Sequence, residues 1–223
     1  MVLSGLKAAC RQGIPKLIIV TALCIGISGC RTKKETLPFY NTADFTAEWI
    51  PATDSRYATI HTIDSFSLYN QSGHIINRDS LKGHIYAANF FFTSCPGICP
   101  VMISNLEKVA AAFTGNDRVK LISFSVMPEV DSVKRLQEYG KQHHIDPSQW
   151  WLLTGNTAQI NQLGRLSYFS EKRAGLTKEN SAFLHTESLL LIDVHSRIRG
   201  IYTATNPSQM IRLIEDINLL LEE

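Results

Sequence analysis

The sequence predicts an α/β fold with a mixed central sheet, and three patterns indicate it. Two nearly continuous apolar runs, at 84–93 and 119–126, are typical of strands that are buried on both faces. Each run is followed by a segment whose apolar residues recur at helical spacing. Strands that alternate with helices form mostly parallel sheets, and a later hairpin pattern at 188–202 adds antiparallel strands.

Each element has its own signal. A β-hairpin is expected at 65–76, because its alternating pattern breaks at Asn70-Gln71-Ser72-Gly73. Three strands and three helices then alternate, at 84–93, 100–113, 119–126, 131–144, 150–153 and 157–168. The last of these helices is expected to turn inward Ile160, Leu163, Gly164 and Leu166. The late hairpin is followed by a closing helix from Pro207, because proline suits the first turn of a helix. This is the order of a thioredoxin-like fold with flanking helices and an added N-terminal β-hairpin.

The first part of the chain resembles a targeting segment. Residues 1–16 carry basic side chains and no acidic one, and an apolar stretch follows at 17–29. That stretch is shorter than the roughly 20 residues of a membrane span and suits a signal peptide. It ends in Ile27-Ser28-Gly29-Cys30, which resembles a bacterial lipobox, so we expect cleavage before Cys30 and lipid on its thiol. The alternative is a simple membrane anchor with an incidental cysteine.

We therefore divide the chain into a lipoprotein signal peptide (1–29), a tether and domain lead-in (30–58) and a folded domain (59–223). The domain has an ordinary globular composition, with a formal net charge of +2 for the whole chain. No basic run or basic-aromatic stripe is present, which argues against a nucleic-acid partner.

The cysteine count directs attention to one motif. Of the five cysteines, Cys10 and Cys24 lie in the signal peptide and Cys30 would carry lipid. The domain then holds only Cys95 and Cys99. A pair this close cannot constrain much chain entropy as a disulfide, so a reactive or metal-binding role is more plausible than a structural one.

Each of these two cysteines is followed by a proline, Pro96 or Pro100. A proline disfavours helical backbone in the residue before it, so we expect both thiols on a loop and a helix that begins at Pro100. Gly97 would let the loop curl until both sulfurs point to one centre. The partial positive charge at the helix N-terminus should lower the thiol pKa values.

Two thiolates favour a soft metal such as Cu(I), because structural Zn²⁺ prefers four ligands and the domain has no further cysteine. A third ligand would most naturally be one of the seven histidines, which are His61, His74, His84, His143, His144, His185 and His195. Spacing alone does not choose among them. His185 is the best candidate, because it ends a long loop directly before an apolar strand, whereas His74, His143, His144 and His195 have the positions of solvated surface residues.

At this point the sequence resembles the Sco/SenC family of copper-binding proteins. The resemblance is carried by "FFFTSCPGICP" at 90–100 and "FLHTESLLLID" at 183–193, and the matching stretches cover most of the chain after about residue 37. It implies a thioredoxin-like fold and a copper site, for Cu(I) or Cu(II), formed by Cys95, Cys99 and His185. It also implies a role in building the dinuclear copper centre of cytochrome c oxidase subunit II.

The resemblance leaves two kinds of function open. The protein would be a membrane-tethered copper chaperone without turnover, serving oxidase subunit II or another exported copper protein. The alternative is a thiol-disulfide oxidoreductase that uses Cys95 and Cys99 to reduce a partner, and a redox or copper sensor is a weaker third possibility. In each case the domain would lie on the extracytoplasmic side of a bacterial cell envelope, held by lipid.

Two positions depart from the family pattern. The family commonly has aspartate where this chain has Met127, and often aspartate before the histidine, where this chain has Leu184. Met127 either fills a gap at the end of a strand or offers a soft thioether to Cu(I). The negative charge that family members place near the thiols is absent from these two positions.

The signal segment gives a first testable prediction. Mass spectrometry of the mature N-terminus should find diacylglycerol on Cys30, because the apolar stretch ends in small residues directly before that cysteine. A Cys30→Ala chain serves as the control and should carry no lipid. An unmodified chain in the membrane fraction that begins at Met1 would contradict the prediction.

Overall fold

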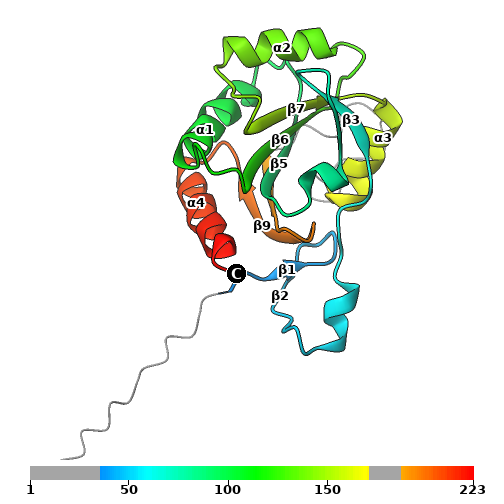
Figure 1. The fold of residues 1–223 in the computed structure, drawn as a ribbon, viewed down its shortest axis with the longest axis vertical. Helices are drawn as coiled ribbons and strands as arrows, with labels where there is room; N and C mark the ends of the chain where they lie inside the picture. Colours follow the sequence, from blue (N-terminus) through cyan, green and yellow to red (C-terminus); the bar gives the residue numbers. More distant parts are fainter. Residues whose placement is uncertain (1–35, 171–186) are drawn as a thin grey trace, which may run out of the picture. The chain divides into compact units, whose positions relative to one another are not determined.

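The computed structural model describes residues 36–170 and 187–223, and seven of their strands form one mixed sheet (Figure 1). The order across this sheet is β4-β3-β7-β6-β5-β8-β9. The strands are β3 (Ser67–Asn70), β4 (Ile75–Asn77), β5 (Ile85–Phe91), β6 (Val119–Ser125), β7 (Trp150–Thr154), β8 (Ser188–Ile192) and β9 (Ile198–Thr203). Only β5, β6 and β7 pair in parallel, and the other pairs are antiparallel. The predicted mixed sheet is confirmed, with a parallel part limited to these three strands.

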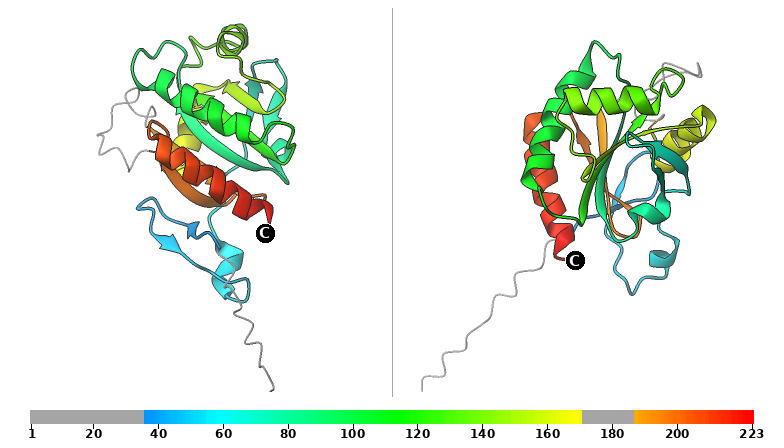
Figure 2. Two further views of the ribbon diagram at one scale, coloured as in Figure 1. Left: turned by 90° about the vertical axis from the view of Figure 1, so that its left-hand side faces the viewer. Right: turned by 45° about the horizontal axis from the view of Figure 1, so that its top comes forward.

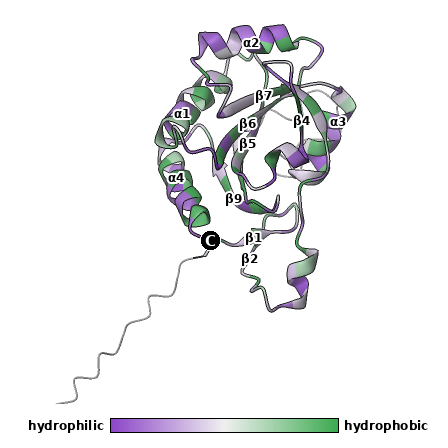
Figure 3. Cartoon of the chain, in the orientation of Figure 1, coloured by the Kyte–Doolittle hydropathy of each residue, from purple (hydrophilic) through white to green (hydrophobic). Residues whose placement is uncertain are grey.

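Helices cover both faces of this sheet. They are α1 (Ile98–Ala112), α2 (Val133–Gln142), α3 (Thr157–Gln162) and α4 (Pro207–Leu221). α1 and α4 run along one face, and α3 lies on the other (Figures 1 and 2). Along α1 and α4 the hydrophobic and hydrophilic residues alternate, whereas α2 is mostly hydrophilic (Figure 3). The apolar core is accordingly divided by the sheet into two layers, with β5 contributing alternate side chains to each.

The third predicted helix is not a regular α-helix to its end. α3 stops at Gln162 and continues as a π-helical turn from Leu163 to Ser167, closed by a hydrogen bond from Tyr168 N–H to Leu163 O of 3.1 Å. The wider turn rotates the following residues, so Tyr168 is fully buried and Leu166 is 57% exposed. The expectation that Leu166 faces the core was therefore wrong, because it assumed a uniform helical period.

Residues upstream of position 59 are part of the folded unit. Two short strands, β1 (Phe39–Tyr40) and β2 (Ala47–Glu48), pair with each other, and Phe39 is buried. The buried guanidinium of Arg199 donates hydrogen bonds to the carbonyl oxygens of Leu37 and Pro38, at 2.8 and 3.1 Å. The folded unit thus starts earlier than the boundary that the sequence composition indicated.

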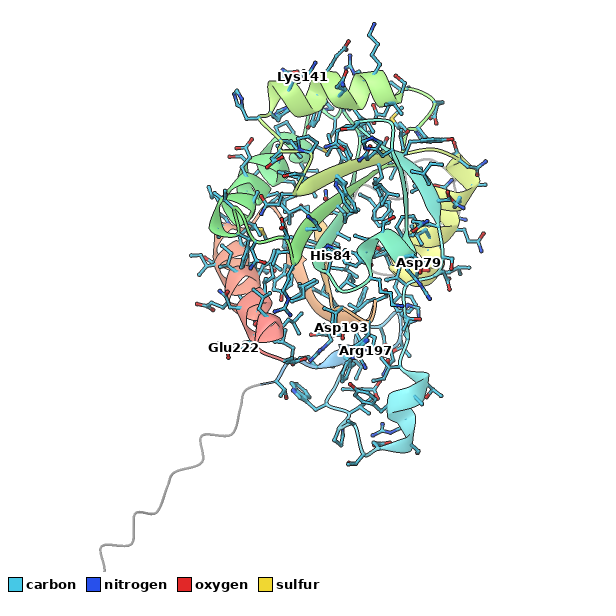
Figure 4. The ribbon with its side chains drawn as sticks, in the orientation of Figure 1. Asp79, His84, Lys141, Asp193, Arg197 and Glu222 are labelled. Atoms are coloured by element: carbon cyan, nitrogen blue, oxygen red, sulfur yellow. The ribbon has the colours of Figure 1, made fainter. Side chains whose placement is uncertain are left out.

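The same guanidinium forms ion pairs with Asp193 at 3.3 Å and with Glu223 at 2.8 Å. Asp193 also pairs with Arg197, and Figure 4 shows these two residues next to each other at the turn between β8 and β9. Arg199 is only 3% exposed, so these partners must compensate the loss of hydration of its buried charge. This network ties the lead-in, the late hairpin and the end of the chain together.

The strand directions determine which loops meet. The loops after β5 and β6 leave the sheet at the same edge, because these strands are parallel. β8 is antiparallel to β5, with Leu189 opposite Asn89, so β8 begins at the edge where β5 ends. No helix within 36–170 or 187–223 has the length and apolar character that crossing a membrane requires.

The Arg199 network gives a stability prediction. Arg199→Met should lower the free energy of unfolding by about 3–5 kcal/mol, because the buried Asp193 loses one of its two ion-pair partners, and Glu223 and two carbonyl oxygens lose the guanidinium. Arg56→Met is a matched control, since Arg56 pairs with Asp54 and Glu48 but is exposed, and it should change stability little. Chemical denaturation of both variants measures the difference, and equal losses would contradict the assignment.

Candidate metal and thiol site

The two thiols lie where β5 leads into α1. β5 ends at Phe91, and the chain turns tightly, with a hydrogen bond from Cys95 N–H to Phe92 O of 3.3 Å. Cys95 is partly exposed after this turn, whereas Cys99 is 1% exposed and part of the core beneath α1. Both are free thiols. The pair therefore combines one accessible and one protected sulfur at the carboxyl end of a central strand.

The helix begins two residues earlier than the prolines indicated. α1 starts at Ile98 with Gly97 as its N-cap, so Cys99 lies in the first turn and Pro100 follows it within the helix. The expected start at Pro100 was wrong because a first-turn proline costs little, since the N–H that it lacks has no partner inside the helix. Only Cys95 is on the loop.

Backbone donors surround the sulfur of Cys95. Partial burial, the largest influence, disfavours its thiolate, but hydrogen bonds from the backbone N–H of Cys99, from its thiol, and from the N–H groups of Gly97 and Ile98 outweigh it. The pKa of Cys95 is lowered below its usual value in consequence. Free N–H groups in the first turn of a helix stabilise an anion in this way. The expected effect of the helix N-terminus holds for this thiol.

The second thiol behaves in the opposite way. Burial, followed by its role as hydrogen-bond donor to Cys95, raises the pKa of Cys99 to about 12. The negative charges of Cys95 and Asp131 add to this rise. The prediction that the helix N-terminus lowers both pKa values was wrong for Cys99, since the loss of hydration exceeds the benefit of the helix.

A cavity of about 210 Å³ opens beside Cys95. Its lining consists of the loop after β5, the first turn of α1 and one side of α2, through Thr93, Cys95, Pro100, Arg135, Glu138, Tyr139, Gln142 and His143. α2 is marked in Figure 4 by Lys141. Tyr139 is fixed in the wall by packing on Phe91, at 5.7 Å between ring centroids, and on His143, at 4.3 Å. The cavity gives a second molecule access to the Cys95 sulfur.

The structure places the histidines differently from the sequence expectation. His143, expected on the solvated surface, is partly buried and lines the cavity. The other described histidines do not line it, and these are His61, His74, His84, His144 and His195. His185 and Cys30 lie outside the described residues. Within the part of the chain that the structure describes, no group of three or more histidine, cysteine or acidic side chains is arranged to hold a metal ion.

A buried carboxyl group lies next to the thiol loop. Asp131, expected to start the second helix, instead precedes its N-cap Ser132 and is fully buried. Its oxygens accept hydrogen bonds from the Thr93 N–H at 3.1 Å, from the Thr93 hydroxyl at 2.5 Å and from the Ser125 hydroxyl at 2.6 Å. Sequence reasoning missed this contact, which joins positions 38 residues apart.

Met127 helps to build the same loop through its backbone. Its N–H donates to the Ser125 hydroxyl at 3.2 Å, and its carbonyl oxygen accepts from Asp131 N–H at 2.8 Å. The side chain is partly buried and is not among the described residues that line the cavity beside Cys95. The buried acidic group next to the thiol loop is therefore Asp131, four residues after Met127.

Comparison with known proteins agrees with this architecture. The SCO1/SenC family model matches residues 54–222. A SCO1/SenC family lipoprotein from Bacillus anthracis is 28% identical, with a TM-score of 0.64 over 72% of this chain and 95% of that one. BsSco, described as a cytochrome c oxidase assembly protein with a disulfide switch, is 26% identical, with a TM-score of 0.61 over 71% and 92%.

A plant structure adds a copper-bound example. ScoI from Arabidopsis thaliana, solved with copper bound, is 25% identical, with a TM-score of 0.55 over 70% of this chain and 97% of that chain. The likeness to these structures confirms the predicted thioredoxin-like α/β fold. Because the family model spans most of the sequence and includes both cysteines of the loop after β5, the chain belongs to the SCO1/SenC family.

Proposed function

We propose that the protein is a lipid-anchored copper chaperone that delivers copper to the dinuclear copper site of cytochrome c oxidase subunit II. The observation that carries this proposal is the pair Cys95 and Cys99, held as free thiols at the start of α1 with one sulfur open to a cavity. Soft thiolates are suited to copper. The copper-bound plant relative and the oxidase-assembly role described for BsSco support the same function.

We assign the third ligand to His185. The sequence places His185 two residues before Glu187, whose carbonyl oxygen accepts from Ala204 N–H at 2.7 Å. β8 begins directly after Glu187, at the edge of the sheet where β5 ends and leads to Cys95. This register supports His185 over the other histidines, because the chain enters β8 beside the thiol loop.

Delivery then proceeds by ligand exchange without turnover. Cys95 is the exposed ligand, so an incoming thiolate or imidazole of the partner replaces it first, through the cavity beside α2. Cys99 is buried and leaves last. A partner that offers more or softer ligands draws the copper toward itself. Oxidase subunit II or another exported copper protein would receive it, and lipid on Cys30 would hold the chaperone at the membrane, as supported by the lipoprotein from B. anthracis.

The unequal thiols favour thiol-disulfide exchange as a second function. The Cys95 thiolate would attack a partner disulfide, form a mixed disulfide and release one partner thiolate. Cys99, after losing its proton, would then attack Cys95, forming the Cys95–Cys99 disulfide and releasing the second partner thiolate. Two electrons pass to the partner, and an external thiol reductant must restore the pair. The disulfide switch described for BsSco supports this alternative.

Copper titration tests the ligand assignment. Anaerobic titration of the reduced protein should give one copper per chain, and Cys95→Ser should abolish tight binding, because a hydroxyl is a poor ligand for a soft metal. His185→Ala should weaken binding and leave the thiols reactive, with the exposed His144→Ala as the control. Transfer to an oxidase subunit II fragment then tests delivery. Unchanged affinity and spectra in His185→Ala would remove His185 from the site.

Thiol alkylation tests the asymmetry on which both functions depend. Because the pKa of Cys95 is lowered from 9.0 and that of Cys99 is raised to about 12, a thiol reagent near pH 8 should modify Cys95 first. The rate at Cys95 should rise with pH and reach its half-maximum below pH 9, and Cys95→Ser should leave only a slow reaction at Cys99. Peptide mass spectrometry separates the two sites. Equal rates at Cys95 and Cys99 would refute the asymmetry.

A further inference from the structure

The hydrogen bonds around Asp131 indicate whether its carboxyl group is ionised. The Ser125 hydroxyl accepts from Met127 N–H at 3.2 Å, and the Thr93 hydroxyl accepts from the Nε–H of Arg135 at 3.1 Å. Each hydroxyl therefore directs its own hydrogen to Asp131. With the Thr93 N–H as a third donor, the carboxyl group only accepts, which is the behaviour of a carboxylate. Asp131 thus provides a buried negative charge.

That charge lies next to the loop that carries Cys95. Thr93, which Asp131 holds at both its N–H and its hydroxyl, stands two residues before Cys95 and lines the same cavity. Because Asp131 is fully buried, solvent and salt screen its field much less than they screen an exposed carboxylate. A metal ion held by the two sulfurs lies within this field.

The two oxidation states of copper respond to this field differently. Cu(II) carries one more positive charge than Cu(I), so a fixed carboxylate stabilises Cu(II) more. We propose that Asp131 is a specificity-determining residue that strengthens the binding of Cu(II) relative to Cu(I), and so sets which copper the protein holds. The inference rests on the proposed copper function and adds the oxidation state to it. Arg135 acts in the opposite direction, but it is exposed and its charge is screened.

The test compares the affinities for Cu(II) and Cu(I), each measured by competition with a chelator. Asp131→Asn keeps the size of the side chain and can still bond to Thr93 and Ser125, but it removes the charge. Its affinity for Cu(II) should fall by about tenfold more than its affinity for Cu(I). Thr93→Val is the matched control, because it removes one hydrogen bond of the network and keeps the carboxylate, and it should change both affinities by the same factor.

A second pair of variants protects the test if Asp131→Asn does not fold. Asp131→Ser is a second neutral variant that can still accept a hydrogen bond and should shift the preference toward Cu(I), whereas Asp131→Glu keeps the charge and should not. A folded Asp131→Asn protein with an unchanged Cu(II) to Cu(I) affinity ratio overturns the inference, as does an unchanged ratio in Asp131→Ser where that variant must decide. A parent protein that binds neither ion overturns the proposed function as well.

Discussion

The site depends on the backbone N–H groups at the start of α1. A helix leaves its first N–H groups without partners, and here those of Gly97, Ile98 and Cys99 are directed to the sulfur of Cys95. Gly97 caps the helix without a side-chain hydrogen bond, so no polar side chain competes for these donors. The groups that lower the pKa of Cys95 therefore belong to the start of the helix.

A buried polar network supports this arrangement from behind. Asp131 connects the end of β6 with the loop after β5, and Arg135 extends the connection to α2. Groups of this kind are costly to bury unless every member is hydrogen-bonded, and within this cluster the carboxylate and both hydroxyls have partners. These hydrogen bonds offset the cost of burial and fix the loop after β5. The position of Cys95 relative to the cavity wall therefore does not depend on apolar packing alone.

Much of the fold could be predicted from local patterns, and much of the site could not. Strands β5 and β6 followed from their nearly continuous apolar runs, and the hairpin β3–β4 from its turn residues. The start of α1 was misplaced because a statistical rule about residues before proline is weak in a first turn. Leu166 was misplaced because one π-helical turn shifts the period, and no residue type announces such a turn.

The contacts of the site escaped prediction for a different reason. Asp131 reaches the thiol loop because parallel strands bring the loops after β5 and β6 to one edge of the sheet, and His143 joins the cavity wall from the end of α2. Both residues are far from Cys95 in the sequence. Their residue types alone predict only the start of a helix for Asp131 and a surface position for His143. Thiol spacing, by contrast, is local, which is why Cys95 and Cys99 could be identified at once.

The Arg199 network fixes the start of the domain at one edge of the sheet. Asp193 follows β8 at the edge where β5 begins, since Ile192 lies opposite Tyr86, and Arg199 fastens Leu37 and Pro38 at that same edge. Cys95 lies at the opposite edge. The first residues of the described domain and the thiol loop are therefore held at opposite edges of the same sheet, so a partner that docks over Cys95 leaves the contacts of Arg199 undisturbed.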